Sequence, residues 1–273
     1  MGAILEESWE NQMKCWEEEL EKCACKCTLP FDKWLETRLN DLPEHIQKEM
    51  FEKVDYVLFH MHSILQSSIF YSETRKRILS FARVISDQVQ TITDLKKLPL
   101  EECYQLAEKE MAKQRLYSFI QGGIASSGGV FSLSADIVLQ IIFHMRAVQT
   151  LSLAYGYEVS SPYEMMLSLK VFHSSLMPKH LKFEAWNQLK EELQNGDDAY
   201  FYEQNEPFVN HQTVNQILKC IAVQTFKYKT IRGKPILSLM IGGGIRYRSM
   251  KVAIEFAHKF YQYRHHYERM SLR

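Results

Sequence analysis

The chain has 273 residues, of which 46% are hydrophobic and 24% are charged, with 11 glycines and 7 prolines. This composition is typical of globular proteins and excludes the disordered and fibrous classes. The 33 basic and 33 acidic side chains cancel, but residues 1–52 hold 13 acidic and 6 basic residues, whereas residues 227–273 hold 11 basic and 2 acidic ones. The basic end can attract phosphate, whether on lipid or on nucleic acid, or it can pair with the acidic end of the same chain. We expect no nucleic-acid partner.

Several missing signals indicate the compartment. No uninterrupted apolar run reaches the roughly 18 residues of a transmembrane helix. Glu6 and Glu7 near the start argue against a secretory signal. The chain also lacks the patterns of myristoylation and prenylation. We therefore expect a cytoplasmic protein that is either free or peripheral at the inner face of the cell membrane.

The cysteines are Cys15, Cys23, Cys25, Cys27, Cys103 and Cys220. In a long chain without a secretory signal we expect thiols rather than a disulfide framework. Structural zinc sites usually carry two separated pairs of ligands, and no second pair follows Cys23, Cys25 and Cys27. We expect no metal and no cofactor, and the role of these three cysteines stays open.

Apolar residues recur at the three- and four-residue spacing of helices, and the alternation typical of strands is nearly absent. This spacing predicts helices over residues 9–20, 46–65 and 78–89, followed by a break at residues 96–99. Pro99, Glu101 and Glu102 are typical of a first helical turn and predict the start of a fourth helix. The fold class is therefore predicted to be all-α, as a single multi-helix domain.

Two apolar, glycine-rich segments are predicted to be central turns at which backbones approach closely. Their glycines are Gly122, Gly123, Gly128 and Gly129 in the first segment and Gly242, Gly243 and Gly244 in the second. We expect no nucleotide-binding loop in the first segment, because it lacks both a preceding strand and the required pattern of glycine or lysine.

A helix predicted over residues 134–155 must be buried, because it is apolar almost all round. Its polar residues Asp136, Gln140 and His144 stand four residues apart and form one stripe. The stripe either faces a pocket or partner, or forms a hydrogen-bonded network at a helix crossing.

Further helices are predicted towards the C-terminus. Ser161, Pro162 and Glu164 form the pattern of a capping box with proline at the first helical position, which predicts a helix to about residue 176. Helices are also expected over residues 178–195 and 211–233. A final basic helix carries residues 250–261.

The order of motifs in the second half resembles the EcsC family. The family has a Gly-Gly-rich stretch, an Asp opening an apolar helix, a Tyr-Gly-Tyr or Tyr-Gly-Phe end and a Glu-Arg pair. Here these correspond to the glycines of residues 122–129, Asp136, Tyr155-Gly156-Tyr157 and Glu164-Met165. The family closes with a glycine-rich turn, Asn-Tyr and Ala-x-x-x-Tyr-Arg-x-Arg, matched here by Gly242 to Gly244, Arg246-Tyr247, Ala257, Tyr261, Gln262 and Arg264.

The resemblance covers about residues 100–269 and implies an all-helical protein without an established activity or assigned catalytic residues. Family members are found in low-GC Gram-positive bacteria beside a two-component ABC exporter, so the implied partners are ABC transporter subunits. We expect an acidic, cysteine-containing N-terminal helix over residues 1–28 and an EcsC-like helical domain over residues 29–273.

Two functions are compatible with these residues. The first is a non-enzymatic accessory at the cytoplasmic membrane face, associated with an ABC transporter or with anionic lipid. Its candidate lipid contacts are Arg246, Arg248, Lys251, Lys259 and Arg264. The alternative is a hydrolase-like enzyme that uses the serines of the first glycine-rich segment with Asp136 and His144. The Gly-x-Ser-x-Gly and His-Glu-x-x-His patterns are absent, so the accessory role is favoured.

Overall fold

The computed structural model describes residues 2–24, 56, 60–126, 133–177, 181–195 and 235–271. Every regular element in these ranges is a helix, which confirms the prediction of an all-α protein. None of the described helices combines the length and the apolarity needed to cross a bilayer. The helix predicted over residues 211–233 and most of the one over residues 46–65 lie outside the described residues.

The helices follow the predicted order, with shifted boundaries, except that a 3-10 helix over residues 92–97 covers part of the break predicted at residues 96–99. They are α1 (Gly2–Ala24), α4 (Ile69–Ile85), the 3-10 helix η1 (Ile92–Lys97), α5 (Leu100–Ser126), α6 (Leu133–Ala154), α7 (Pro162–Leu176), α8 (Lys182–Asn195) and α10 (Pro235–Ser271). Residues 60–66 are also helical. α7 begins as predicted, because Ser161 accepts a hydrogen bond from the Glu164 backbone N–H and Pro162 occupies the first turn.

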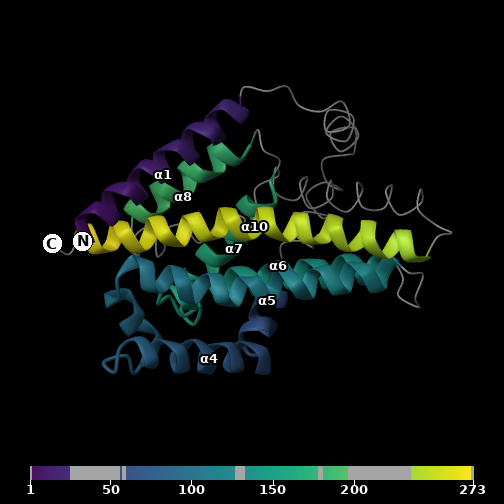
Figure 1. Ribbon diagram of the computed structural model, residues 1–273, viewed down its shortest axis with the longest axis horizontal. Helices are drawn as coiled ribbons and strands as arrows, with labels where there is room; N and C mark the ends of the chain where they lie inside the picture. The colour runs from purple at the N-terminus through teal and green to yellow at the C-terminus, as the bar shows by residue number, and fades with distance from the viewer. Residues whose placement is uncertain are drawn as a thin grey trace.

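The long helices α5 and α10 lie side by side along the molecule (Figure 1) and form its most extensive helix contact. They run antiparallel, since Cys103 near the start of α5 meets His265 near the end of α10, and Glu108 meets His258. α6 packs against both, and α7 packs against α6 and α10. α1 and α8 lie together on one side of this assembly, and α4 lies on the opposite side (Figure 1).

Large aromatic side chains fill the core between these helices. The largest fully buried ones include Trp186, Tyr155, Tyr157, Tyr261, Phe172, Phe256 and Phe260. Helix α1 docks on this core through Trp16, whose ring centroid lies 4.8 Å from that of Trp186 and 5.9 Å from that of Phe256. Glu17 accepts hydrogen bonds from Trp186 Nε1 at 2.6 Å and from Lys190 Nζ at 3.0 Å. α1 is thus packed on α8 and α10, and the boundary at residue 28 stays a prediction.

The glycine-rich segments are helical where the structure describes them, so the turns predicted at these glycines are not present. Gly122 and Gly123 lie near the end of α5, and Gly242, Gly243 and Gly244 lie near the start of α10. The antiparallel register brings the two runs to the same level of the helix pair. An interior glycine costs a helix about 1 kcal/mol relative to alanine. Tertiary contacts supply most helical stability, so the packing of this long helix pair offsets that cost. Gly128 and Gly129 lie outside the described residues.

Candidate functional site

Gly156 ends α6 in a turn that requires glycine. Its φ is +89°, and a Cβ added to it would lie 2.7 Å from Lys96 Cγ and 2.8 Å from the Lys96 backbone nitrogen. The Tyr157 backbone N–H closes the turn on the Ser152 carbonyl oxygen at 2.9 Å. As a result Tyr155 and Tyr157, on either side of the glycine, are both buried against α10.

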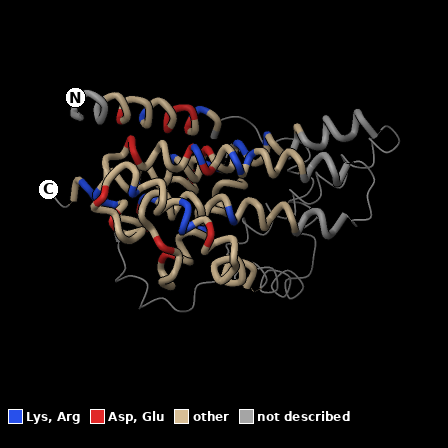
Figure 2. Tube along the Cα trace, turned by 60° about the horizontal axis from the view of Figure 1, so that its bottom comes forward, with Lys and Arg blue, Asp and Glu red and all other residues tan. Residues whose placement is uncertain are grey.

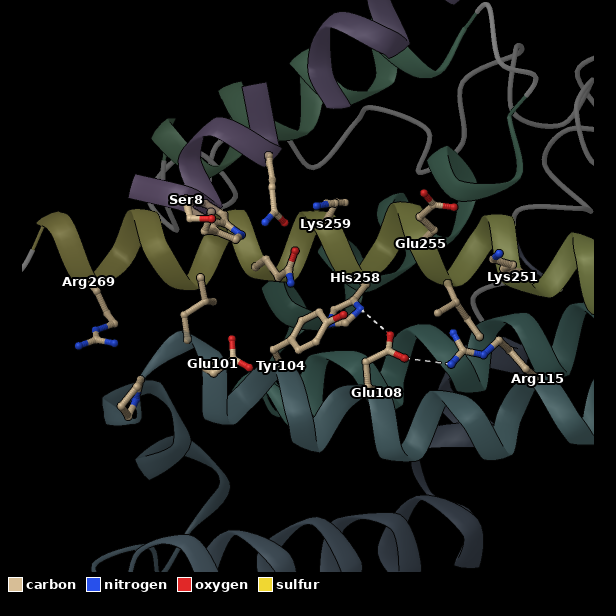
Figure 3. A pocket seen from close by; sticks show the side chains of 16 residues that line it. Ser8, Glu101, Tyr104, Glu108, Arg115, Lys251, Glu255, His258, Lys259 and Arg269 are labelled. Atoms are coloured by element: carbon tan, nitrogen blue, oxygen red, sulfur yellow. Dashed lines mark hydrogen bonds and ion pairs between the residues drawn. The ribbon is translucent and has the colours of Figure 1, made fainter. Parts of the chain in front are cut away.

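Tyr155 is the inner end of a chain of polar contacts that runs from the core to the surface. Its hydroxyl lies 2.7 Å from His258 Nε2, and His258 Nδ1 lies 3.4 Å from Glu108 Oε1. Arg115 Nη2 lies 3.0 Å from Glu108 Oε2, so that the carboxylate contacts both groups (Figure 3). The Tyr104 ring stacks on His258, with ring centroids 5.0 Å apart.

The environment of each group decides its protonation state. Hydrogen bonds from His258 and then from Arg115 lower the pKa of Glu108 to about 2. Burial lowers the pKa of His258, although the Glu108 carboxylate acts in the opposite direction. Burial also raises the pKa of Tyr155 well above its usual value. One arrangement satisfies these groups: the Tyr155 O–H donates to Nε2 of a neutral His258, whose Nδ1–H donates to the ionised Glu108.

A groove of about 790 Å³ opens where this chain of contacts reaches the surface. Its lining residues belong mainly to α10, α5 and α1 (Figure 3). The polar ones are Ser8, Gln12, Glu101, Tyr104, Glu108, Arg115, Lys251, Glu255, His258, Lys259, Gln262 and Arg269. Trp9, Pro99, Leu100 and Ile254 complete the lining, so the groove has both apolar and charged walls.

Three of the four Lys and Arg cations in the groove make no ion pair with a residue that the structure describes. Arg115 is held by Glu108, and Arg269 donates to a backbone carbonyl at 3.1 Å. Lys251 and Lys259 make no ion pair with a described residue. Partial burial lowers the pKa of Lys259, although the nearby Glu255 carboxylate acts in the opposite direction. An ammonium group that forms no ion pair in a groove is suited to binding an anion.

The predicted polar stripe of α6 lies at a helix crossing. Gln140 and His144 are both buried, and the Gln140 carbonyl oxygen lies 2.7 Å from His144 Nδ1. Ser249 Oγ on α10 lies 3.4 Å from His144 Nε2 and 3.5 Å from Gln140 Nε2. Asp136 lies in α6, but its side chain is outside the described residues. Because neither described member of the stripe lines the groove, the hydrolase alternative gains no support from it.

The predicted lipid contacts fall into three environments. Arg248 and Lys251 are exposed on α10, and Lys259 is half-buried in the groove. The prediction for Arg264 needs correction, because its side chain is only 4% exposed and does not reach a lipid surface. Arg246 lies in α10 with its side chain outside the described residues.

Arg264 instead joins α7 and η1 to α10. Its guanidinium donates to Glu164 at 2.6 and 2.7 Å and to Glu268 at 2.7 Å. Glu268 also accepts from Lys96 Nζ at 3.3 Å. The Tyr157 ring contacts both cations, with its centroid 3.7 Å from Arg264 Cζ and 4.3 Å from Lys96 Nζ. The Glu164 carboxylate thus binds Arg264, although the sequence predicted a role in a capping box.

The cysteines with described surroundings differ in exposure. Cys15 is exposed, Cys23 is half-buried, and burial raises the pKa of the Cys103 thiol to about 12, which makes it a poor nucleophile. Within the described ranges, no three His, Cys, Asp or Glu side chains form a group that could hold a metal ion. Cys25 and Cys27 lie outside the described residues, so the role of the cluster stays open.

Comparison with known proteins decides the family. The model of the EcsC protein family matches residues 7–265. This chain belongs to the EcsC family. The EcsC match starts inside α1 and contains the Tyr155-Gly156-Tyr157 corner, Glu164 and Arg264. The structure therefore brings two residues of the EcsC motifs, Glu164 and Arg264, into one ion pair in which the arginine is buried.

Two curated proteins of Bacillus subtilis (strain 168) are similar to this EcsC-family chain. "Uncharacterized protein YdbA" is 29% identical over 168 residues, which are 60% of this chain and 57% of YdbA. "Protein EcsC" is 25% identical over 143 residues, which are 52% of each chain. The chain thus spans about half the length of the curated relatives it matches. No solved structure matches it.

Sequence reasoning missed the groove and the chain of contacts beneath it. Tyr104, Glu108 and Arg115 stand four and seven residues apart on α5 and so share one helix face. Lys251 and Lys259 repeat at a similar spacing on α10. Such stripes indicate a polar helix face, but they do not identify the helix that the face meets.

Proposed function

We propose that this EcsC-family protein is a non-enzymatic accessory at the cytoplasmic face of the membrane, where it binds anionic lipid reversibly. The supporting observation is a surface on the paired helices that combines exposed apolar side chains with unpaired basic ones. We call it the α5/α10 surface. It consists of Leu116, Phe119 and Ile120 of α5 and Tyr247, Arg248, Lys251 and Val252 of α10.

The members of the α5/α10 surface are exposed and lie at the same level of the antiparallel pair. Leu116 is 55% exposed and Ile120 is 47% exposed. Exposed apolar side chains beside basic residues are typical of interaction sites, and tyrosine is favoured at membrane interfaces. Arg248 and Lys251 make no ion pair with a described residue. Each such cation contributes about 1 kcal/mol near an anionic membrane surface.

In the described part of the chain, the acidic helix α1 makes no ion pair with Arg248 or Lys251 of the α5/α10 surface. Figure 2 shows the acidic positions of α1, beside the mark N, at one edge of the molecule. Trp9 and Glu10 contact His266, and Trp16 contacts Phe256. These contacts lie on the C-terminal half of α10, so α1 does not neutralise the basic residues of the surface.

Vesicle flotation tests the lipid proposal. The protein should float with mixed phosphatidylcholine–phosphatidylglycerol vesicles and remain in solution with pure phosphatidylcholine. Because charge is screened over about 8 Å at physiological salt, higher ionic strength should release it. Equal binding to neutral and anionic vesicles, or binding to neither, would reject the proposal.

Matched variants locate the contact. Arg248→Glu removes one attraction and adds one repulsion, so it should weaken anionic-vesicle binding by about 2 kcal/mol, or roughly thirtyfold. Lys14→Glu makes the same charge change at an exposed position of α1 and should bind as the unmodified protein does. Leu116→Asp should also weaken binding, whereas Val84→Asp, at an 85% exposed position of α4, should not. Equal effects of the α5/α10 variants and their controls would contradict the assignment of this surface.

The proposed protein partner is an ABC transporter, which rests on the family resemblance. Proteoliposomes that contain the two-component exporter should retain the protein at an ionic strength that releases it from lipid alone. Identical release from both kinds of vesicle would remove the transporter from the proposal and leave the lipid contact.

A further inference from the structure

The groove contains a charge pattern that the α5/α10 surface does not explain. Lys251, Glu255 and Lys259 follow one another at four-residue intervals on the side of α10 that lines the groove. Four cations and three carboxylates line the groove, which leaves one positive charge unbalanced. In Figure 3 Lys259 lies on the side of α10 that faces α1, while His258 points towards α5.

Lys259 is the cation of the groove whose surroundings most favour a bound anion. It is half-buried, so its ammonium group has lost part of its hydration, and no described carboxylate forms an ion pair with it. Ordinarily a buried charge is compensated by a counter-ion or by hydrogen bonds. An oxyanion bound in the groove would supply both, and Ser8 and Gln12 on the α1 wall offer further hydrogen-bond donors.

The charge and the position of the groove narrow the class of oxyanion. One unbalanced positive charge matches a singly charged phosphodiester better than a doubly charged phosphomonoester, which the exposed Glu255 would repel. The groove also shares Lys251 with the α5/α10 surface.

We propose that this groove is a phosphodiester-binding site in which Lys259 and Lys251 hold the phosphate. One source of the phosphodiester is the headgroup of a glycerophospholipid, and this source rests on the proposed membrane function. The other source is a soluble glycerophosphodiester.

Titration calorimetry on the full chain tests the site with glycerophosphoglycerol as the soluble phosphodiester, glycerol 3-phosphate as the monoester, and phosphatidylglycerol-containing vesicles. Lys259→Gln should weaken phosphodiester binding by about tenfold or more, because it removes one charge-assisted hydrogen bond. Glu255→Gln should tighten it by about threefold, since it removes a nearby like charge. Lys14→Gln is the matched control and should leave affinity unchanged. Thermal unfolding of each variant verifies the fold.

The results separate this site from the membrane proposal. Lysine-dependent binding of glycerophosphoglycerol supports the site even when vesicles do not bind, and the membrane proposal then fails alone. Lysine-dependent binding of vesicles without the soluble compound supports the lipid headgroup as the source. If Lys259→Gln binds every probe as the unmodified protein does, or if no probe binds, the site is rejected. Arg248-dependent flotation then still supports the membrane function.

Discussion

Replacing Arg264 by methionine is expected to lower the free energy of unfolding by about 3 to 5 kcal/mol. The arginine side chain is 4% exposed and donates three hydrogen bonds to Glu164 and Glu268. Each hydrogen bond to a charged group contributes about 1.5 to 3 kcal/mol, and the contact with the Tyr157 ring adds about 0.5 to 2 kcal/mol. The sum overstates the loss, because the side chains of Glu164 and Glu268 are 15% and 34% exposed and recover hydration once the arginine is gone.

A double-mutant cycle measured by urea unfolding and circular dichroism tests this account. Arg264→Met combined with Glu164→Leu should cost less than the sum of the two single changes, by about 1.5 to 3 kcal/mol, because no uncompensated charge remains from that pair. The control cycle changes Lys22 and Glu18 in the same way. Their side chains are 73% and 64% exposed, and an exposed helical pair should couple by only about 0.5 kcal/mol. A cost below about 1 kcal/mol for Arg264→Met, or additive single costs, would refute the reasoning.

Two further predictions concern pH and glycine. Burial lowers the pKa of His62 to about 4 and that of His173 to about 3, from the ordinary value of 6.5. The unfolded chain therefore binds these protons at a higher pH than the folded chain does, and the urea midpoint of unfolding should fall as the pH drops from 6.5 through about 4. His62→Gln should flatten this decline. A midpoint that does not change with pH would contradict the burial of these histidines. Gly156→Ala should cost more than about 2 kcal/mol, because its positive φ and the clash with Lys96 both oppose a side chain. Gly244→Ala, at a helical position with open space, should instead raise the free energy of unfolding by about 0.5 to 1 kcal/mol and with it the melting temperature. Equal effects of the two changes would show that the turn at Gly156 is not strained.

The local features of this chain are readable from its sequence. Ser161 and Pro162 mark the start of α7, Gly156 marks the turn after α6, and the nearly all-apolar pattern of α6 indicates its burial. These predictions hold because caps, left-handed turns and helical periodicity depend on residues a few positions apart. The order and spacing of the motifs likewise indicate the EcsC family from the sequence alone.

Only the tertiary structure decided which polar groups meet. Glu164 fits a local capping pattern, yet its carboxylate binds Arg264, which is 100 residues away in the sequence. The run of Gly242 to Gly244 predicts a turn, yet α10 continues through it beside α5. Periodicity identifies the face that a helix buries but not the helix that covers it, and burial in turn sets the pairing and the pKa of each charged group. The groove at Lys259 depends on such tertiary contacts, since its walls come from α1, α5 and α10, which are far apart in the sequence.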